Sequence, residues 1–89
     1  MKPLLGFTIL FGLAGVAQAQ AQGECDNLWF ERNQIYKEAG YCFRTAAAIR
    51  QFVNAGCVYV DQNDVPLSNR NRARINEILR VERALRCPR

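Results

Sequence analysis

Residues 28–43, LWFERNQIYKEAGYCF, hold the clearest structural signal in the chain. Their apolar side chains recur at the three- and four-residue spacing of one helical face. This spacing predicts a helix over residues 27–39 whose core-facing side consists of Leu28, Ile35 and Ala39.

Both ends of this helix have residues that are suited to stop it. Asp26 or Asn27 can cap its start by accepting hydrogen bonds from the first free amide groups. Gly40 fits the left-handed backbone conformation that often follows the last turn of a helix. In that motif Tyr41 packs back on Tyr36, so we expect an aromatic pair to close the helix.

A short second helix is predicted over residues 46–55. Thr45 is its cap, and Gly56 repeats the stop signal. Its apolar edge consists of Ile49, Phe52 and Val53. Residues 58–60 are expected to be extended.

A third helix is predicted over residues 69–86, with Ser68 or Asn69 as its cap. Its apolar face consists of Ile75, Ile78, Leu79 and Leu85, with Val81 at the edge. The predicted fold is therefore all-α, a small three-helix domain.

The first 19 residues have the three parts of a cleavable Sec-type secretory signal. Lys2 supplies the positive charge, residues 4–17 form an apolar run of 14 residues, and Ala19 ends a small-residue cleavage site. An uncleaved membrane anchor is disfavoured because the run is short for a membrane span. We expect cleavage after Ala19, or after Ala21, which leaves residues 20–89 as one periplasmic or secreted domain.

All four cysteines lie in that domain, as is typical of disulfides in small exported proteins. A zinc site is disfavoured because the intervals of 17, 15 and 30 residues contain no C-x-x-C pair, and the chain has no histidine. Cysteines at opposite ends of one helix lie too far apart to be linked, because a helix rises about 1.5 Å per residue. Avoiding every such pair predicts the disulfides Cys25–Cys57 and Cys42–Cys87.

Two charged residues interrupt the apolar faces of the predicted helices. Arg32 lies within the apolar face of the first helix, and Glu82 lies within that of the last. Because a charge in a core needs a partner, we expect a buried ion pair between them. We favour a structural pair that sets the helix register over a pocket in which Arg32 binds an anionic ligand.

The end of the chain is strongly basic. Residues 69–89 carry seven arginines and two glutamates, whereas residues 20–68 carry four basic and six acidic residues. The candidate anion-binding residues are Arg70, Arg72, Arg74, Arg80 and Arg83. They scatter around both flanks of the helical wheel, and two of the arginines have glutamates at helical spacing, Glu77 for Arg80 and Glu82 for Arg86. A solvated surface is therefore the default interpretation, and contact with an acidic envelope polymer or a membrane surface is the alternative.

Catalysis finds little support in the sequence. Without histidine, and with the cysteines oxidised, the usual general bases and thiol nucleophiles are missing. No carboxylate spacing marks a pair for glycoside hydrolysis. The stretch after Asp61 begins like a calcium loop but has Arg72 where the last ligand would fall. No metal or cofactor is predicted.

Residues 28–43 resemble the YARHG domain family, whose pattern is approximately L-W-x-x-R-N-x-I-Y-A-R-H-G-Y-x-F. The matching positions are Leu28, Trp29, Arg32, Asn33, Ile35, Tyr36, Gly40, Tyr41 and Phe43. Lys37, Glu38 and Ala39 replace three of the five letters that name the family. The resemblance implies an extracellular or cell-surface domain of bacteria and no particular reaction.

Together these observations predict a non-catalytic binding or structural module of the bacterial cell envelope. Its expected partner is an envelope polymer or envelope protein, and export separates it from nucleic acid. The alternatives are a small hydrolase or inhibitor-like effector acting on the cell wall, and a cationic binder of membrane surfaces. An exposed patch around Trp29 and Phe30 would indicate a partner protein.

Overall fold

The computed structural model describes residues 2–88, and it describes side chains from residue 20 onward. Its elements are α1 (Lys2–Glu38), α2 (Ala46–Phe52), the 3-10 turn η1 (Gln62–Asp64) and α3 (Asn69–Ala84). Helices are the only regular elements over residues 2–88, so the predicted all-α class with two disulfides is confirmed. The predicted secretory signal lies outside the residues whose side chains are described, and it stays a prediction.

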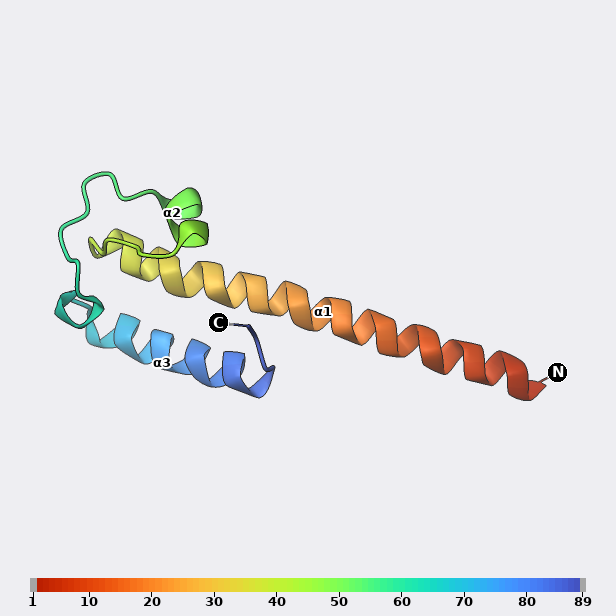
Figure 1. Cartoon of the computed structure of the whole chain (residues 1–89). Coiled ribbons are helices and arrows are strands. Elements are labelled where there is room, and N and C mark those ends of the chain that lie inside the picture. Colours follow the sequence, from red (N-terminus) through yellow and green to blue (C-terminus); the bar gives the residue numbers. More distant parts are fainter. Residues whose placement is uncertain (1, 89) are drawn as a thin grey trace.

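Helices α1 and α3 lie side by side in opposite directions, and α2 packs against the last turns of α1 (Figure 1). The leading part of α1 extends away from this packed region (Figure 1). None of the helices described over residues 2–88 combines the length and the hydropathy that a membrane span requires.

The start of the first predicted helix is wrong, whereas its end is confirmed. Helix α1 runs unbroken through Asp26 and Asn27, so neither residue caps it. The physical reason is that residues 18–24, QAQAQGE, are mostly good helix formers, and the single Gly23 costs only about 1 kcal/mol. No strong stop signal therefore separates the apolar run from Leu28.

Helix α1 ends in a Schellman motif around Gly40, which has φ 95°. The Tyr41 amide donates to the Tyr36 carbonyl at 3.0 Å, and the Gly40 amide donates to the Lys37 carbonyl at 3.1 Å. The rings of Tyr36 and Tyr41 lie 5.6 Å apart, as expected. A side chain at Gly40 would also crowd the Tyr59 ring, since a Cβ there would lie 3.3 Å from it.

Helix α2 is shorter than predicted and uses a different face. Thr45 caps it by accepting from the Ala48 amide at 3.2 Å. Ala48 and Phe52 are buried, whereas Ile49 and Val53 of the predicted apolar edge are exposed. Ala48 and Phe52, four residues apart, pack with Phe43, so Ile49 turns outward. Val53 lies beyond the end of the helix, with φ 54°. The two predictions are therefore wrong.

Asn54 explains why the chain leaves the helix at that point. Its side-chain amide accepts from the Phe43 amide at 2.8 Å and donates to the Phe43 carbonyl at 3.0 Å. The side chain thereby forms hydrogen bonds with both backbone groups of Phe43, as a neighbouring strand would. This pairing draws residues 53–57 back beside residue 43.

Helix α3 has the predicted cap, ends two residues early, and buries only part of its predicted apolar face. Ser68 accepts from the Asn71 amide at 3.0 Å, and Ile75 and Ile78 are buried. Leu79 is half-buried, and Val81 lies at the surface. The placement of Leu85 on the apolar face is wrong, because the helix ends at Ala84 and Leu85 is exposed. The helix ends because Arg86 adopts φ 56° and the Cys87 amide donates to the Glu82 carbonyl at 2.9 Å.

The predicted disulfide pairing is wrong. The bonds are Cys25–Cys87 and Cys42–Cys57, with Cα–Cα distances of 5.5 and 5.2 Å. The prediction excluded Cys42–Cys57 because a helix of ten residues was expected between them. Helix α2 has only 7 residues, about 10 Å in length, and the segments on either side of it turn back and meet.

Backbone hydrogen bonds hold those two segments together. The Cys42 amide donates to the Tyr59 carbonyl at 2.8 Å, and the Val58 and Tyr59 amides donate to the Gly40 carbonyl. Tyr41 and Tyr59 form an isolated parallel bridge, so the extended backbone expected at residues 58–60 is confirmed only at Tyr59. The other bond, Cys25–Cys87, links α1 to the end of α3.

Candidate binding site

A pocket of about 290 Å³ opens between α1, the segment 41–45 and the start of α2. Its volume is near the lower limit for small-molecule sites, so it suits a group the size of one sugar or amino acid. Five of the nine positions that match the YARHG pattern line it: Trp29, Arg32, Asn33, Tyr41 and Phe43.

The other motif positions build the fold. Leu28 is buried and Ile35 is half-buried. Tyr36 and Gly40 form the Schellman motif that ends α1. The motif therefore divides between residues that build the fold and residues that line the pocket. We call the antiparallel pair of α1 and α3 the hairpin of α1 and α3.

Aromatic side chains form the wall between the pocket and the core. Phe43 and Phe52 stack with ring centroids 5.2 Å apart, and Tyr41 meets Phe43 edge-on at 5.1 Å. Trp29 packs on Phe52 at 5.7 Å. The Asn33 side chain is buried and donates to the Trp29 carbonyl at 2.9 Å, which joins two lining residues within one turn of α1.

Arg32 and Glu82 form the ion pair that the sequence predicts. Arg32 Nε lies 2.9 Å from Glu82 Oε1, and Arg32 Nη2 lies 3.1 Å from Glu82 Oε2. The Glu82 side chain is 2% exposed and that of Arg32 is 18% exposed. This bidentate geometry fixes the plane of the guanidinium, and the Arg32 side chain also lines the pocket.

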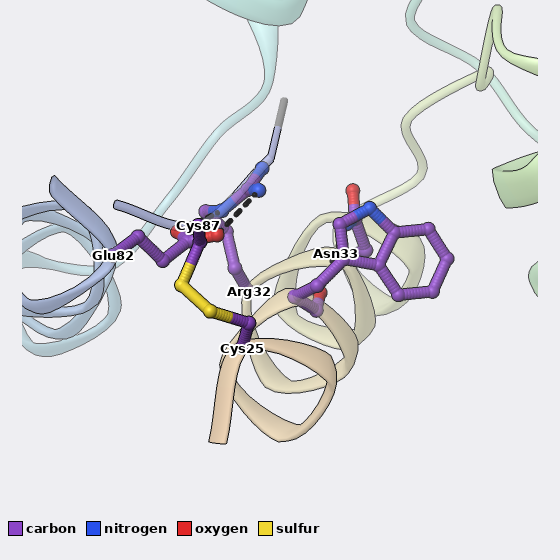
Figure 2. Close-up of polar contacts among 6 residues, drawn as sticks. Cys25, Arg32, Asn33, Glu82 and Cys87 are labelled. Carbon is purple, nitrogen blue, oxygen red and sulfur yellow. Dashed lines mark hydrogen bonds and ion pairs between the residues drawn. A yellow bond between two sulfur atoms is a disulfide. The ribbon is translucent and has the colours of Figure 1, made fainter. Parts of the chain in front are cut away.

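The ion pair is held between two covalently linked helices. Figure 2 shows the Cys25–Cys87 disulfide beside the Arg32–Glu82 pair. Cys87 follows the turn that ends α3, and its amide donates to the Glu82 carbonyl. The disulfide therefore limits how far Glu82 can move from Arg32, so the pair is both a structural contact and a preorganised side of the pocket.

Several lining residues were not predicted as site residues. Arg44 is exposed and comes directly after Phe43, and Gln62 is exposed at the start of η1. The position of Arg44 between an aromatic residue and the Thr45 cap is a local signal that could have indicated it. Gln62 and Pro88 have no such signal because they reach the pocket only through the tertiary fold.

The patch around Trp29 and Phe30 that would indicate a partner protein is only partly exposed. Phe30 is 44% exposed and packs on Phe52 with ring centroids 5.2 Å apart. Trp29 is half-buried between the pocket and a second hollow of about 320 Å³, which is also lined by Asp26 and Ala47.

The candidate anion-binding arginines fall into two groups. Arg74 binds Glu31, with Nε–Oε2 and Nη2–Oε1 distances of 2.5 and 2.6 Å, and it also pairs with Glu77. The hydrogen bond from Arg74 holds the pKa of Glu31 below its usual value. Arg70, Arg72, Arg80 and Arg83 are exposed. Glu77, the expected partner of Arg80, is bound to Arg74 instead.

The lining of the pocket consists mainly of aromatic, guanidinium, amide and small side chains. Over residues 20–88, no carboxylate lines it, and the Thr45 hydroxyl accepts the capping hydrogen bond of α2. The described residues also contain no cluster of three His, Cys, Asp or Glu side chains that could hold a metal ion. Aromatic surfaces and guanidinium donors remain, which suit an anionic or sugar-like group.

Comparison with known proteins places these features in one family. The model of the YARHG domain matches residues 9–83, which include all of the motif and most of α3. Neither the curated proteins nor the solved structures give a match to the chain. The two disulfides and the family are both consistent with a protein that works outside the cytoplasm. The chain belongs to the YARHG domain family.

Proposed function

We propose that the protein is a non-catalytic binding module of the bacterial cell envelope and that the pocket beside Arg32 receives its ligand. The observation that carries this proposal is the convergence of five motif positions on one open pocket. Folding alone requires Leu28, Tyr36 and Gly40, but it does not require an open space beside a guanidinium.

The lining of the pocket supports an anionic ligand. Glu82 neutralises Arg32 but leaves the Nη1 group of Arg32 without a hydrogen-bond partner among residues 20–88. Arg44 lies at the same pocket, is exposed, and forms no ion pair within the described part of the chain. Two guanidiniums next to aromatic walls can bind a carboxylate or phosphate and pack against its carbon skeleton.

An envelope polymer fits this pocket better than a reaction substrate does. The hydrolase alternative would need a carboxylate acid and base facing the ligand, and the lining over residues 20–88 contains neither. Polymers of the cell wall present repeated carboxylate or phosphate groups outside the cytoplasm, where the disulfides are stable.

Sedimentation with purified peptidoglycan sacculi tests the proposal. The exported, oxidised protein should sediment with the sacculi, and the double variant Arg44→Ala/Gln62→Ala should bind roughly tenfold more weakly. Both substitutions remove exposed side chains that line the pocket, so the fold should be retained.

The matched control is Arg50→Ala/Gln51→Ala, which removes the same two side-chain types from exposed positions of α2 outside the pocket. This variant should bind like the parent protein. The proposal is overturned if the parent does not sediment with sacculi, or if both double variants lose the same amount of binding.

A further inference from the structure

The ion pairs of the hairpin leave the arginines of α3 unevenly neutralised. Arg74 takes both Glu31 and Glu77, and Glu82 binds Arg32. The glutamates expected to neutralise Arg80 and Arg86 are thus engaged with other partners.

Three of the four remaining exposed arginines of α3 share one flank of the helix, whereas Arg70 lies about 160° from Arg72. At about 100° per residue, Arg72 and Arg83 lie about 20° apart, and Arg80 lies within about 80° of Arg72. We call these three residues the arginine flank. Within the described part of the chain none of the three forms an ion pair with a carboxylate. The paired Arg74 projects from the opposite side of α3.

Arg72 and Arg83 of the arginine flank face the pocket side of the molecule, and Arg80 lies beyond them. Leu79 lines the pocket, and on the helical wheel it lies about 20° from Arg72 and about 40° from Arg83. The charge of Arg72 also reaches Tyr36, where it opposes the rise in pKa that burial causes. Tyr36 in turn packs on the pocket residue Tyr41.

We infer that the pocket and the arginine flank form one continuous site for a linear polyanion. One unit of the polymer enters the pocket beside Arg32 and Arg44, and its neighbouring carboxylates or phosphates lie along the arginine flank. From Arg72 to Arg83 the helix rises about 16 Å, which spans several polymer units. This inference rests on the proposed function and adds to it the class of ligand and the direction in which it runs.

The acidic residues near the pocket set that direction. Asp61 and Asp64 are exposed and lie within two residues of Gln62, which lines the pocket. The Asp61 side chain also accepts a hydrogen bond from the Asn63 amide at 2.9 Å. A polyanion is therefore repelled from the η1 side and attracted along α3.

A polymer fits this surface better than a membrane does. A helix that lies on a membrane needs apolar side chains beside its cationic flank. The apolar face of α3 is instead turned into the core, with Ile75 and Ile78 buried. Its exposed Val81 lies about 180° from Arg72, on the other side of the helix.

The only tryptophan of the chain gives a direct readout, because Trp29 lines the pocket. Soluble polyglutamate and soluble polyphosphate of matched charge should be titrated separately while Trp29 fluorescence is recorded. At least one polymer should change the fluorescence, and its affinity should fall roughly 20- to 100-fold between about 50 mM and about 200 mM salt. The polymer that binds more tightly identifies the anionic group as carboxylate or phosphate.

Two double variants with the same net charge test the position of the site. Arg72→Gln/Arg83→Gln should weaken binding roughly tenfold and lower the slope of log affinity against log salt by about 2. Arg50→Gln/Arg70→Gln changes two exposed arginines away from the arginine flank and should leave affinity and slope unchanged.

The inference is overturned if neither polymer changes Trp29 fluorescence, or if the two double variants weaken binding equally. It is also overturned if vesicles of phosphatidylglycerol bind while both polymers do not. If sedimentation with sacculi depends on Arg44 and Gln62 but not on the arginine flank, the proposed function stands and only the polyanion site fails.

Discussion

At the scale of single residues, Val53 is held in a backbone conformation that valine rarely adopts. It has φ 54° and ψ 159°, a region that is used almost only by glycine. Two hydrogen bonds hold it there: its amide donates to the Ile49 carbonyl, and its carbonyl accepts from Lys37 Nζ, both at 2.9 Å. The strain arises because the chain must turn at Val53 for the Asn54 side chain to reach the backbone of Phe43.

We therefore expect Val53→Gly to stabilise the protein. Relief of the strained conformation outweighs the entropy that glycine loses on folding, and the net gain should be about 1 kcal/mol. Urea denaturation of the oxidised protein measures it. The control is Val58→Gly at a more exposed position without positive φ, which should lose about 0.5 kcal/mol. A lower midpoint for Val53→Gly would contradict the strain.

Substitution of either residue of the Arg32–Glu82 pair should destabilise the protein, because removing one partner leaves the other charge largely buried. Glu82→Ala should lower the free energy of unfolding by about 3–5 kcal/mol. The double variant Arg32→Met/Glu82→Leu should recover most of that loss, since apolar residues of similar volume replace a buried pair well. Both values come from urea denaturation, and a fully stable Glu82→Ala protein would contradict a buried pair.

At the scale of elements, the two disulfides stabilise different parts of the fold. Cys42–Cys57 closes a loop over 15 positions around α2, and Cys25–Cys87 closes one over 62 positions around the hairpin of α1 and α3. Loop-closure entropy assigns them roughly 3 and 4 kcal/mol.

Replacing Cys42 and Cys57 by serine should therefore act locally. Amide hydrogen exchange should lose protection over residues 43–57, while α3 keeps its protection because its contacts with α1 are separate. Replacing Cys25 and Cys87 should instead lower the protection of α3. A peptide map that joins Cys25 to Cys57 would contradict both expectations.

The contact between Glu31 and Arg74 makes the hairpin of α1 and α3 sensitive to acid. Because Arg74 lowers the pKa of Glu31 in the folded protein, the contact stabilises the fold above the usual carboxyl value of about 4.5. This contribution is lost as the pH falls through the folded pKa. Denaturation curves of the parent and Glu31→Gln should differ slightly at neutral pH, converge in acid, and converge in high salt as well.

The elements also show which parts of the fold a sequence determines locally. Gly40, Thr45 and Ser68 end or begin their helices as predicted, because a cap depends on hydrogen bonds within a few residues. The end of α2 was predicted too late, because it depends on Asn54 pairing with residue 43 across eleven positions. The prediction of the disulfide pairing was wrong for the same reason, because Cys42 and Cys57 meet only when the chain turns back after α2.

The candidate site divides in the same way. Arg32 and Glu82 could be paired from their places on two helical faces, because each interrupts an apolar stripe. The sequence could not distinguish the paired Arg74 from the unpaired arginines of the arginine flank. That distinction depends on Glu31, a residue of α1, which takes Arg74.

At the scale of the whole molecule, a domain of this size buries little apolar surface and needs covalent links. The same links restrain the helices that carry its charges: one side holds the paired Glu31 and Arg74, and the other holds the pocket and the arginine flank. Fixed positions of the helices favour the binding of a repeated anion, because the backbone that carries the arginines needs no reordering on contact.

The boundary of this unit leads to a prediction about processing. Cys25 is buried and linked to Cys87, whereas residues 22–24 are exposed. The leading part of α1 extends away from α2 and α3 (Figure 1). Cleavage after Ala19 or Ala21 should therefore leave every stabilising contact in place.

Mass spectrometry of the exported protein should find its first residue at Gln20 or Gln22. Its urea midpoint and the slope of its unfolding transition should equal those of the oxidised full-length chain, because that slope reports the surface that unfolding exposes. A midpoint that falls on removal of residues 1–21 would mean that this segment packs on the domain. The folded unit would then begin before Cys25 and would include the leading segment of α1.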